Sequence, residues 1–322
     1  MLVKKTNFHL SPTKLSNMNL LASIGHTPLI RLTNVVPKNS AEVWVKYEGN
    51  NPTGSYKDRV ALGVIKKAMA RGDLKAGDRI CEYTGGSTGT SIAFVSSILG
   101  LKFTAVSSRV FAASKLQAMR TYGAEIILEE SSDGTLNPEL FQRMKDRVQE
   151  ISSQSGSYYF DQFGSPDIRP SYAAIGVEIA DEMDGAIDAV CSAVGTAGSL
   201  MGTVDGLAQR GIKPDIYALE PLQSPLLTTG KGGGHLVEGI ALGFIPPFLD
   251  MNVIKEARAI DQEAGFEMCR RLSKEEGVLA GGSTGLNVVA ALGLAQELGA
   301  GKRIVTLGCD NGIKYLGGHI YS

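Results

Sequence analysis

Short apolar runs rich in β-branched residues alternate along the chain with longer segments whose apolar positions have helical spacing. The first run, AEVWVKY at 41–47, predicts a strand, and apolar positions within 59–70 predict a helix after it. The same alternation predicts further strands at 79–83, 102–106, 125–128, 189–194, 215–219 and 303–307, and helices at 88–99, 114–121, 137–152, 172–183, 199–209, 262–276 and 286–298. Such alternation is typical of parallel sheets covered on both faces.

A Gly-, Pro- and Ser-rich segment, FGSPDIRP at 163–170, separates two series of these elements. We therefore predict two α/β domains, each an open, twisted, mostly parallel sheet flanked by helices, with a cleft between them. The length of 322 residues agrees with two domains, because single hydrophobic cores rarely grow beyond about 250–300 residues.

Charge and composition narrow the range of partners. The 32 Lys and Arg residues against 33 Asp and Glu leave a formal net charge of −1, which gives no field to hold a nucleic acid or an acidic membrane surface. No window approaches about 18 consecutive apolar residues, and residues 1–16 lack the apolar stretch of a signal peptide. The four cysteines form no CxxC pair and the four histidines no cluster, so we expect a cytoplasmic protein without disulfides or a metal.

Glycine is abundant, with 39 residues, and two of its clusters lie between a predicted strand and a predicted helix. They are TGGSTG at 84–89 and GTAGS at 195–199. Free backbone N–H groups and the helix dipole make such a loop an anion site, and its hydroxyls add hydrogen bonds. Neither loop has the G-x-G-x-x-G spacing of a dinucleotide site, and no G-x-x-x-x-G-K-[S/T] occurs. Either loop alone could be a tight turn, but the pair favours ligand binding.

The turn-rich segment NPTGSYKDR, at 51–59, places Lys57 at the opening of a predicted helix. A cation is disfavoured near a helix N-terminus, and burial would lower the pKa of the amine further. Such an amine is a nucleophile that can form a Schiff base. On its own, however, a lysine at this position is more often a solvated surface residue.

Seven segments in order resemble the cysteine synthase and cystathionine β-synthase family of fold-type II pyridoxal-phosphate enzymes. They are IGHTPL (24–29), NPTGSYKDR (51–59), TGGSTG (84–89), GTAGS (195–199), EGIALGFIP (238–246), EGVLAG (276–281) and GIKYL (312–316). The resemblance implies a smaller, mobile domain at 51–165 that binds the substrate carboxylate. It also implies a larger, phosphate-binding domain made of 1–50 and 166–322, and a homodimer.

The resemblance assigns roles to individual residues. Lys57 would hold pyridoxal 5'-phosphate as an internal aldimine, and the phosphate would lie on Gly195, Thr196, Ala197, Gly198 and Ser199. The substrate carboxylate would lie on Thr84, Gly85, Gly86, Ser87 and Thr88, assisted by Gln162. Gly239 would lie near the substrate amino group.

Two positions depart from the family pattern. The family commonly has Ser-Gly-Asn where this chain has Gly85-Gly86-Ser87, so Ser87 replaces an asparagine that reaches the phenolic oxygen of the cofactor. Asp310 stands where many relatives place a serine beside the pyridine nitrogen, and an ionised carboxylate there would strengthen the electron sink. Asp310 could instead cap a helix, and Cys309 could be a small buried neighbour.

The resemblance implies β-replacement on O-acetylserine. Lys57 would remove the α-proton, the β-substituent would leave to give α-aminoacrylate, and sulfide or another thiol would add, so that sulfide yields L-cysteine. Two related activities stay open. They are cystathionine formation, encouraged by the segment VEGI at 237–240, and cysteine desulfhydrase activity. From a different class, the chain could be a non-catalytic paralogue that uses the cleft only for binding.

Overall fold

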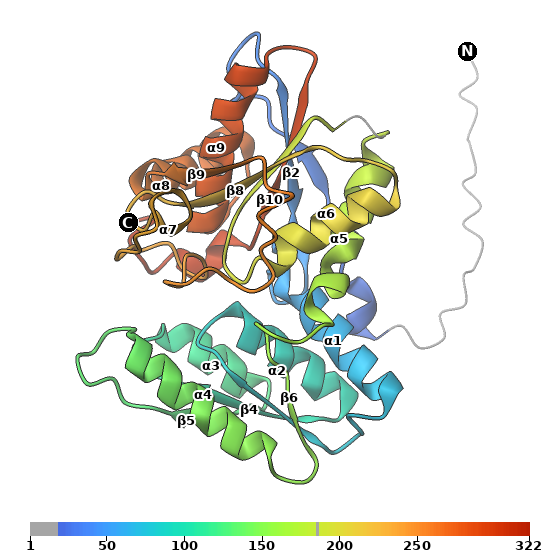
Figure 1. Ribbon diagram of the computed structural model, residues 1–322, viewed down its shortest axis with the longest axis vertical. Helices are drawn as coiled ribbons and strands as arrows, with labels where there is room; N and C mark the ends of the chain where they lie inside the picture. The colour runs from blue at the N-terminus through green and yellow to red at the C-terminus, as the bar shows by residue number, and fades with distance from the viewer. Residues whose placement is uncertain (1–18, 185–186) are drawn as a thin grey trace, which may run out of the picture.

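The structure, a computed structural model, describes residues 19–184 and 187–322 (Figure 1). The segment 1–16, where we expect no signal peptide, lies outside the described residues. Ten strands form two separate sheets, one of six strands and one of four, within the described ranges. Apart from the antiparallel pair β1–β2, every strand pairing is parallel, which confirms the predicted class of two mostly parallel sheets.

The larger sheet combines strands from both ends of the chain. In spatial order its strands are β1 (Leu29–Arg31), β2 (Glu42–Tyr47), β10 (Arg303–Gly308), β7 (Ala189–Ala193), β8 (Asp215–Pro221) and β9 (Glu256–Ile260). Its helices are α5 (Ile168–Glu182), α6 (Gly198–Gln209), α7 (Leu226–Thr229), α8 (Gln262–Arg271) and α9 (Gly282–Leu298). The last strand, β10, lies between β2 and β7, so the sheet needs both chain ends.

The smaller sheet is built from one continuous part of the chain. Its strands, in spatial order, are β5 (Glu125–Leu128), β4 (Lys102–Ser107), β3 (Arg79–Tyr83) and β6 (Ser157–Tyr159). Its helices are α1 (Lys57–Arg71), α2 (Ser87–Leu99), α3 (Ala113–Thr121) and α4 (Pro138–Ser152). Three short 3-10 turns, η1 (Leu20–Ser23), η2 (Glu48–Asn50) and η4 (Gly312–Tyr315), and one π-helical turn, η3 (Leu272–Glu276), complete the description.

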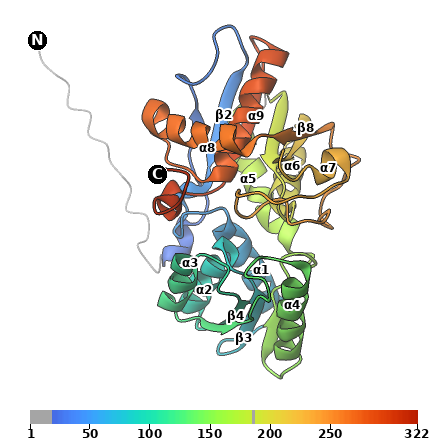
Figure 2. The same ribbon diagram turned by 90° about the vertical axis from the view of Figure 1, so that its left-hand side faces the viewer.

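Successive side chains of the buried strands point to opposite faces of their sheet, and helices cover both faces. In β7, Val190 points into the core beneath α5 and α6, whereas Ala189 and Cys191 point into the core beneath α8 and α9. Figure 2 shows these two pairs of helices on opposite sides of the larger sheet. In the smaller sheet, Ile80 faces α1 and α2, and Cys81 faces α4.

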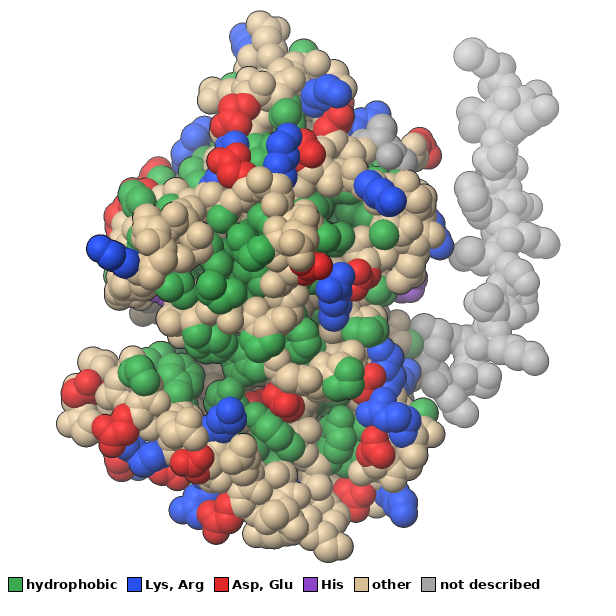
Figure 3. Space-filling view, viewed as in Figure 1, with side chains coloured by type: hydrophobic (Ala, Val, Ile, Leu, Met, Phe, Trp, Pro, Cys, Tyr) green, Lys and Arg blue, Asp and Glu red, His purple; other side chains and the backbone are tan. Residues whose placement is uncertain are grey.

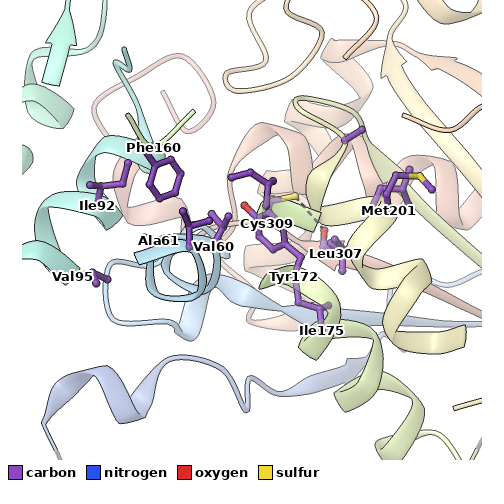
Figure 4. Packing of buried hydrophobic residues seen from close by; sticks show 14 of the residues in the cluster. Val60, Ala61, Ile92, Val95, Phe160, Tyr172, Ile175, Met201, Leu307 and Cys309 are labelled. Carbon is purple, nitrogen blue, oxygen red and sulfur yellow. Dashed lines mark hydrogen bonds between the residues drawn. The ribbon is translucent and has the colours of Figure 1, made fainter. Parts of the chain in front are cut away.

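One apolar core joins the two sheets. It runs from Ile92 in α2 through Val60 in α1 to Tyr172 in α5 and Leu307 in β10, all of them 2% exposed or less (Figure 4). Burial of this apolar surface fixes the base of α1 against both halves of the molecule. The residue that begins α1, Lys57, is thereby held at the junction.

Most predicted elements match, and the differences have physical reasons. The predicted loop 163–170 overlaps α5, which begins at Ile168, because Pro170 is tolerated in the first turn of a helix. The predicted helix 262–276 is wrong at its end, since α8 stops at Arg271 and η3 follows it. The pattern gave no sign of β1, β6 or β9, which are short or poor in β-branched residues.

Candidate active site

A cavity of about 480 Å³ lies between the two halves of the molecule, and Lys57 is part of its wall. The predicted site residues that line it with Lys57 are Thr84, Gly85, Gly86, Ser87, Thr88, Gln162, Thr196, Gly239 and Asp310. Gly195, Ala197, Gly198 and Ser199 do not line it, but they flank Thr196 at the start of α6. The structure therefore brings both predicted anion loops to one cavity.

The C-terminal segment positions Lys57. The backbone N–H of Tyr56 donates to the carbonyl oxygen of Cys309 at 3.1 Å, and the N–H of Asn311 donates to the carbonyl oxygen of Gly54 at 2.9 Å. These bonds hold the turn before α1 against the end of β10. Lys57 follows directly, with its Nζ 4.8 Å from the ring centroid of Tyr56.

The environment of Lys57 favours the neutral amine. Burial lowers the pKa of Lys57 from 10.5 to about 8, against a smaller opposing effect of the Cys309 thiol. Within the described part of the chain, no carboxylate pairs with this amine. Roughly a tenth of Lys57 is therefore unprotonated at pH 7 and half of it near pH 8, and the unprotonated amine is the form that a nucleophile or a base requires.

A buried ion pair anchors the same segment from the other side. Arg59, two residues after Lys57, donates from Nε to Glu48 at 2.6 Å and from Nη1 to Glu178 at 2.6 Å. The Arg59 and Glu48 side chains are 4% and 0% exposed. Separating the partners would leave a buried charge uncompensated, which is strongly destabilising. The pair therefore fixes the direction of the first turn of α1.

The loop before α6 is shaped by backbone. Ala197 has φ +64, and the N–H of Gly198 donates to Oγ1 of Thr196 at 3.3 Å. A Cβ atom at Gly195 would lie only 2.4 Å from the carbonyl oxygen of Gly239. Glycine at 195 therefore lets two backbone segments meet, and the N–H groups that follow Gly198 in the first turn of α6 point toward the loop, where an anion can bind.

The loop before α2 is shaped by side chains. Thr84 accepts from the N–H of Gly89 at 3.2 Å, and Thr88 donates to Oε1 of Gln162 at 3.0 Å. The Gln162 amide nitrogen donates to the carbonyl oxygen of Tyr83 at 3.2 Å. Gln162, predicted from the family resemblance alone, thus lies directly against this loop.

Glu82 lies beneath this loop and was missed by the sequence analysis. It is fully buried near the end of β3, and its two carboxyl oxygens accept the backbone N–H groups of Gln162 at 3.0 Å and of Tyr83 at 2.9 Å. Burial raises the pKa of Glu82 from 4.5 to about 8. The signal was available, because an acidic residue in a buried strand next to a glycine-rich loop is unusual.

Ser87 and Asp310 both contact residues of the C-terminal turn. Lys314 donates to Oγ of Ser87 at 3.2 Å, and the Tyr315 hydroxyl donates to Oδ2 of Asp310 at 2.6 Å. Burial raises the pKa of Asp310, with Lys314 opposing. Oδ1 of Asp310 has no hydrogen-bond partner among the residues described. The helix-cap interpretation of Asp310 is wrong, since Asn311 caps η4.

Two further residues that the sequence did not point to, Lys115 and Glu238, bridge the cleft. Lys115 of α3 forms an ion pair with Glu238, which precedes Gly239 on the opposite side. The Lys115 side chain is 10% exposed, and its Nζ lies 5.0 Å from the ring centroid of Tyr315. The two halves are therefore joined by charge at the cavity as well as by the apolar core.

The family described as "Pyridoxal-phosphate dependent enzyme" matches residues 20–310, nearly the whole chain. The chain belongs to this family. The enzyme is 37% identical over 307 residues to a cysteine synthase of Staphylococcus aureus (strain Mu50 / ATCC 700699), an alignment that covers 94% of this chain and 97% of that one.

Solved structures agree with this assignment. O-acetyl serine sulfhydrylase isoform 3 from Entamoeba histolytica superimposes with a TM-score of 0.88 at 30% identity, covering 97% of this enzyme and 93% of that chain. O-ureido-L-serine synthase superimposes with a TM-score of 0.87 at 31% identity, covering 94% of each chain. The fold-type II architecture and the cysteine synthase type of enzyme are thereby confirmed.

The cofactor is pyridoxal phosphate, as predicted, and the site residues fit it. Among the described residues, the wall offers an amine without a counter-ion at Lys57, a helix N-terminus for an anion, and an unpartnered carboxyl oxygen on Asp310. In residues 19–184 and 187–322, no group of three or more His, Cys, Asp or Glu side chains is placed to hold a metal. Over the same ranges, no helix combines the length and the apolar character needed to cross a membrane.

Proposed function

We propose that this enzyme catalyses β-replacement on O-acetylserine, with sulfide as the nucleophile and L-cysteine as the product. The observation that carries the proposal is the place of Lys57, whose amine, with its pKa lowered to about 8, lies in a cavity lined by both anion loops. A lysine so placed can both bind an aldehyde and take a proton.

We assign the two loops to two anions. The loop Gly195–Ser199 would hold the cofactor phosphate on its N–H groups, because it lies at a helix N-terminus and carries no charged side chain. The loop Thr84–Thr88, with Gln162, would hold the substrate carboxylate, because its hydroxyls and the adjacent amide can donate from several directions. Lys57 would then face the α-carbon.

The proton movements can be followed on the chain's own atoms. Nζ of Lys57 would take the α-proton, the bond from the β-carbon to oxygen would break, and acetate would leave. Sulfide would form the new bond to the β-carbon, and Nζ of Lys57 would return the proton to the α-carbon. The bound cofactor supplies the electron sink for this chemistry. Asp310 would face its pyridine nitrogen with the unpartnered Oδ1.

Exclusion of water is the remaining requirement, since water at the β-carbon would divert the reaction to pyruvate and ammonia. We propose that residues 51–165 form a unit that closes on residues 19–50 and 166–322, with Gly239, at φ +82, in a loop of the larger unit that lines the cavity. The ion pair between Lys115 and Glu238 would then hold the closed form. A homodimeric, cytoplasmic enzyme is part of the same proposal, by analogy with the family.

The proposal is tested with the purified holoenzyme and the Lys57→Ala variant. We expect the wild type to release acetate from O-acetylserine and to form cysteine with sulfide, and Lys57→Ala to lose at least about 1,000-fold in rate. The variant should also lose the visible absorption of the lysine-bound cofactor. Lys66→Ala, an exposed lysine on the same helix, should retain both.

A panel of donors separates the related activities. Sulfide consumption with O-acetylserine supports the proposal. Thioether formation from serine and homocysteine would instead indicate cystathionine formation, and sulfide release from cysteine would indicate cysteine desulfhydrase activity. A wild-type protein that retains the cofactor but releases nothing from any donor would support a binding function instead.

A further inference from the structure

One end of the cavity is apolar. Beyond the loop Thr84–Thr88, its wall consists of Val110, Phe111, Leu136, Phe141 and Met144. Four of these side chains pack on or belong to the small core between α4 and the smaller sheet, away from α1. The cavity therefore runs along the carboxyl ends of the parallel strands, from the amine of Lys57 to an apolar compartment beside α4.

Phe111, one wall of this compartment, packs against Gly85, where the chain departs from the family pattern. A Cβ atom at Gly85 would lie only 1.9 Å from Cγ of Phe111. A serine, which the family commonly has at this position, could not coexist with the Phe111 ring where it now lies. The ring thus occupies the space that any side chain at position 85 would need, so an apolar surface lies directly against the loop Thr84–Thr88.

Aromatic rings continue this surface across the cleft. Tyr83 and Phe163 stack with ring centroids 5.9 Å apart, and Phe163 contacts Phe244 of the opposite side at 5.5 Å. Phe244 and Leu136 are each 47% exposed. Apolar side chains are therefore present at the surface on both sides of the cleft (Figure 3). The route from solvent to Lys57 therefore passes apolar surface.

Sulfide gains nothing from such a wall, because it has no apolar surface to bury. A larger nucleophile with an aromatic or branched group would cover these side chains and remove them from water, which favours binding.

We propose that the enzyme also takes apolar thiols in place of sulfide, with the apolar group bound in the compartment formed by Val110, Phe111, Leu136, Phe141 and Met144. This inference rests on the proposed β-replacement. In the reaction, the thiol sulfur bonds to the β-carbon, the bond from that carbon to the acetyl oxygen breaks, and the thiol proton is released as acetate leaves. The product is an S-substituted cysteine.

The test compares two thiols of similar nucleophilicity on the holoenzyme with O-acetylserine. We expect kcat/KM for benzyl mercaptan to exceed that for 3-mercapto-1,2-propanediol by at least tenfold. Calorimetry provides a readout apart from turnover, and S-benzyl-L-cysteine should bind at least tenfold more tightly than S-(2,3-dihydroxypropyl)-L-cysteine.

Variants locate the preference. Leu136→Asp places a charge at the mouth of the compartment and should lower the ratio of kcat/KM for benzyl mercaptan to that for sulfide about tenfold. Leu222→Asp, at an exposed leucine outside the cavity, should leave the ratio unchanged. Phe141→Ala should lower the ratio, and Phe141→Leu should restore most of it.

The outcomes are distinguishable. Acetate release without any preference between the two thiols, or a preference that Leu136→Asp leaves intact, would overturn the inference and leave the proposed reaction standing. No acetate release at all would overturn the proposed reaction and, with it, the inference.

Discussion

The loops before α2 and α6 have the same place in their sheets and opposite constructions. Each follows a parallel strand and opens a helix, so each offers free N–H groups to an anion. Around α6, Ala197 at φ +64 and the contact of Gly195 with Gly239 fix the backbone itself. Around α2, Gly86 has an extended backbone with open space beside it, and hydroxyl and amide side chains provide the order.

On the proposed assignment of the two anions, one local geometry would serve two ligands that stay bound for different times. A cradle fixed by backbone contacts is preorganised and suits a phosphate that stays bound through many turnovers. A cradle ordered by Thr88, Gln162 and the buried Glu82 can adjust when a substrate arrives and leaves. The comparison therefore predicts different responses to equivalent changes in the two loops.

The largest expected effect comes from adding one methyl group to each loop. Gly195→Ala would place Cβ 2.4 Å from the carbonyl oxygen of Gly239, so the α6 loop must shift. We expect cofactor affinity to fall at least 100-fold, measured by fluorescence titration of the apoenzyme. Gly86→Ala meets nothing within 4 Å and has φ −134, so it should leave cofactor affinity unchanged. Equal losses in both variants, with folding verified by circular dichroism, would contradict the comparison.

A smaller effect concerns pH, because neither loop offers a carboxylate to Lys57. Only the neutral amine adds to the cofactor aldehyde, and the pKa of Lys57 is lowered to about 8. The rate of cofactor uptake by the apoenzyme should therefore rise about 50-fold between pH 6 and pH 8 and level off above pH 8. Stopped-flow absorption would follow it. A lysine peptide, as control, should keep rising toward pH 10, and the same behaviour in the enzyme would refute the lowered pKa.

The smallest effect comes from Glu82→Gln. Glutamine can accept only one of the two N–H bonds now made to Gln162 and Tyr83, so the α2 loop loses order. We expect KM for the amino-acid donor to rise about tenfold, and the free energy of unfolding at pH 6 to fall by about 1–3 kcal/mol. Cofactor affinity should not change, which separates this loop from the other.

The pH dependence of that variant has a definite sign. Burial raises the pKa of Glu82 from 4.5 to about 8 in the folded state, so its contribution to stability is present below pH 4.5 and is lost as pH rises through 8. Glutamine does not titrate. The stability advantage of the wild type over Glu82→Gln should therefore shrink between pH 4.5 and 8, as measured by urea unfolding. A constant difference would argue against the raised pKa.

Sequence patterns predicted the regular part of the fold well. The strand at 79–83 and the strand at 125–128 match β3 and β5 residue for residue, because each is a short apolar run next to a helix. Lys57 was correctly placed at the start of a helix, and both glycine loops at a strand-to-helix junction. These features depend on residues close together in the sequence.

The remaining features depend on contacts between distant residues. The ion pair of Lys115 with Glu238 joins positions 123 residues apart, and the clash of Gly85 with Phe111 depends on how one loop lies on another. Neither pattern nor spacing contains that information. The roles given to the individual site residues and the division at 51–165 stay predictions, which the variants above address.

The central place of β10 has a consequence for synthesis of the chain. This strand, Arg303–Gly308, pairs with β2 on one side and β7 on the other, and it is translated after the other strands of the described chain. Until then the N-terminal hairpin has no neighbour, whereas every strand of the four-stranded sheet is already translated. A nascent chain must therefore keep the edges of β1 and β2 protected until β10 has been translated.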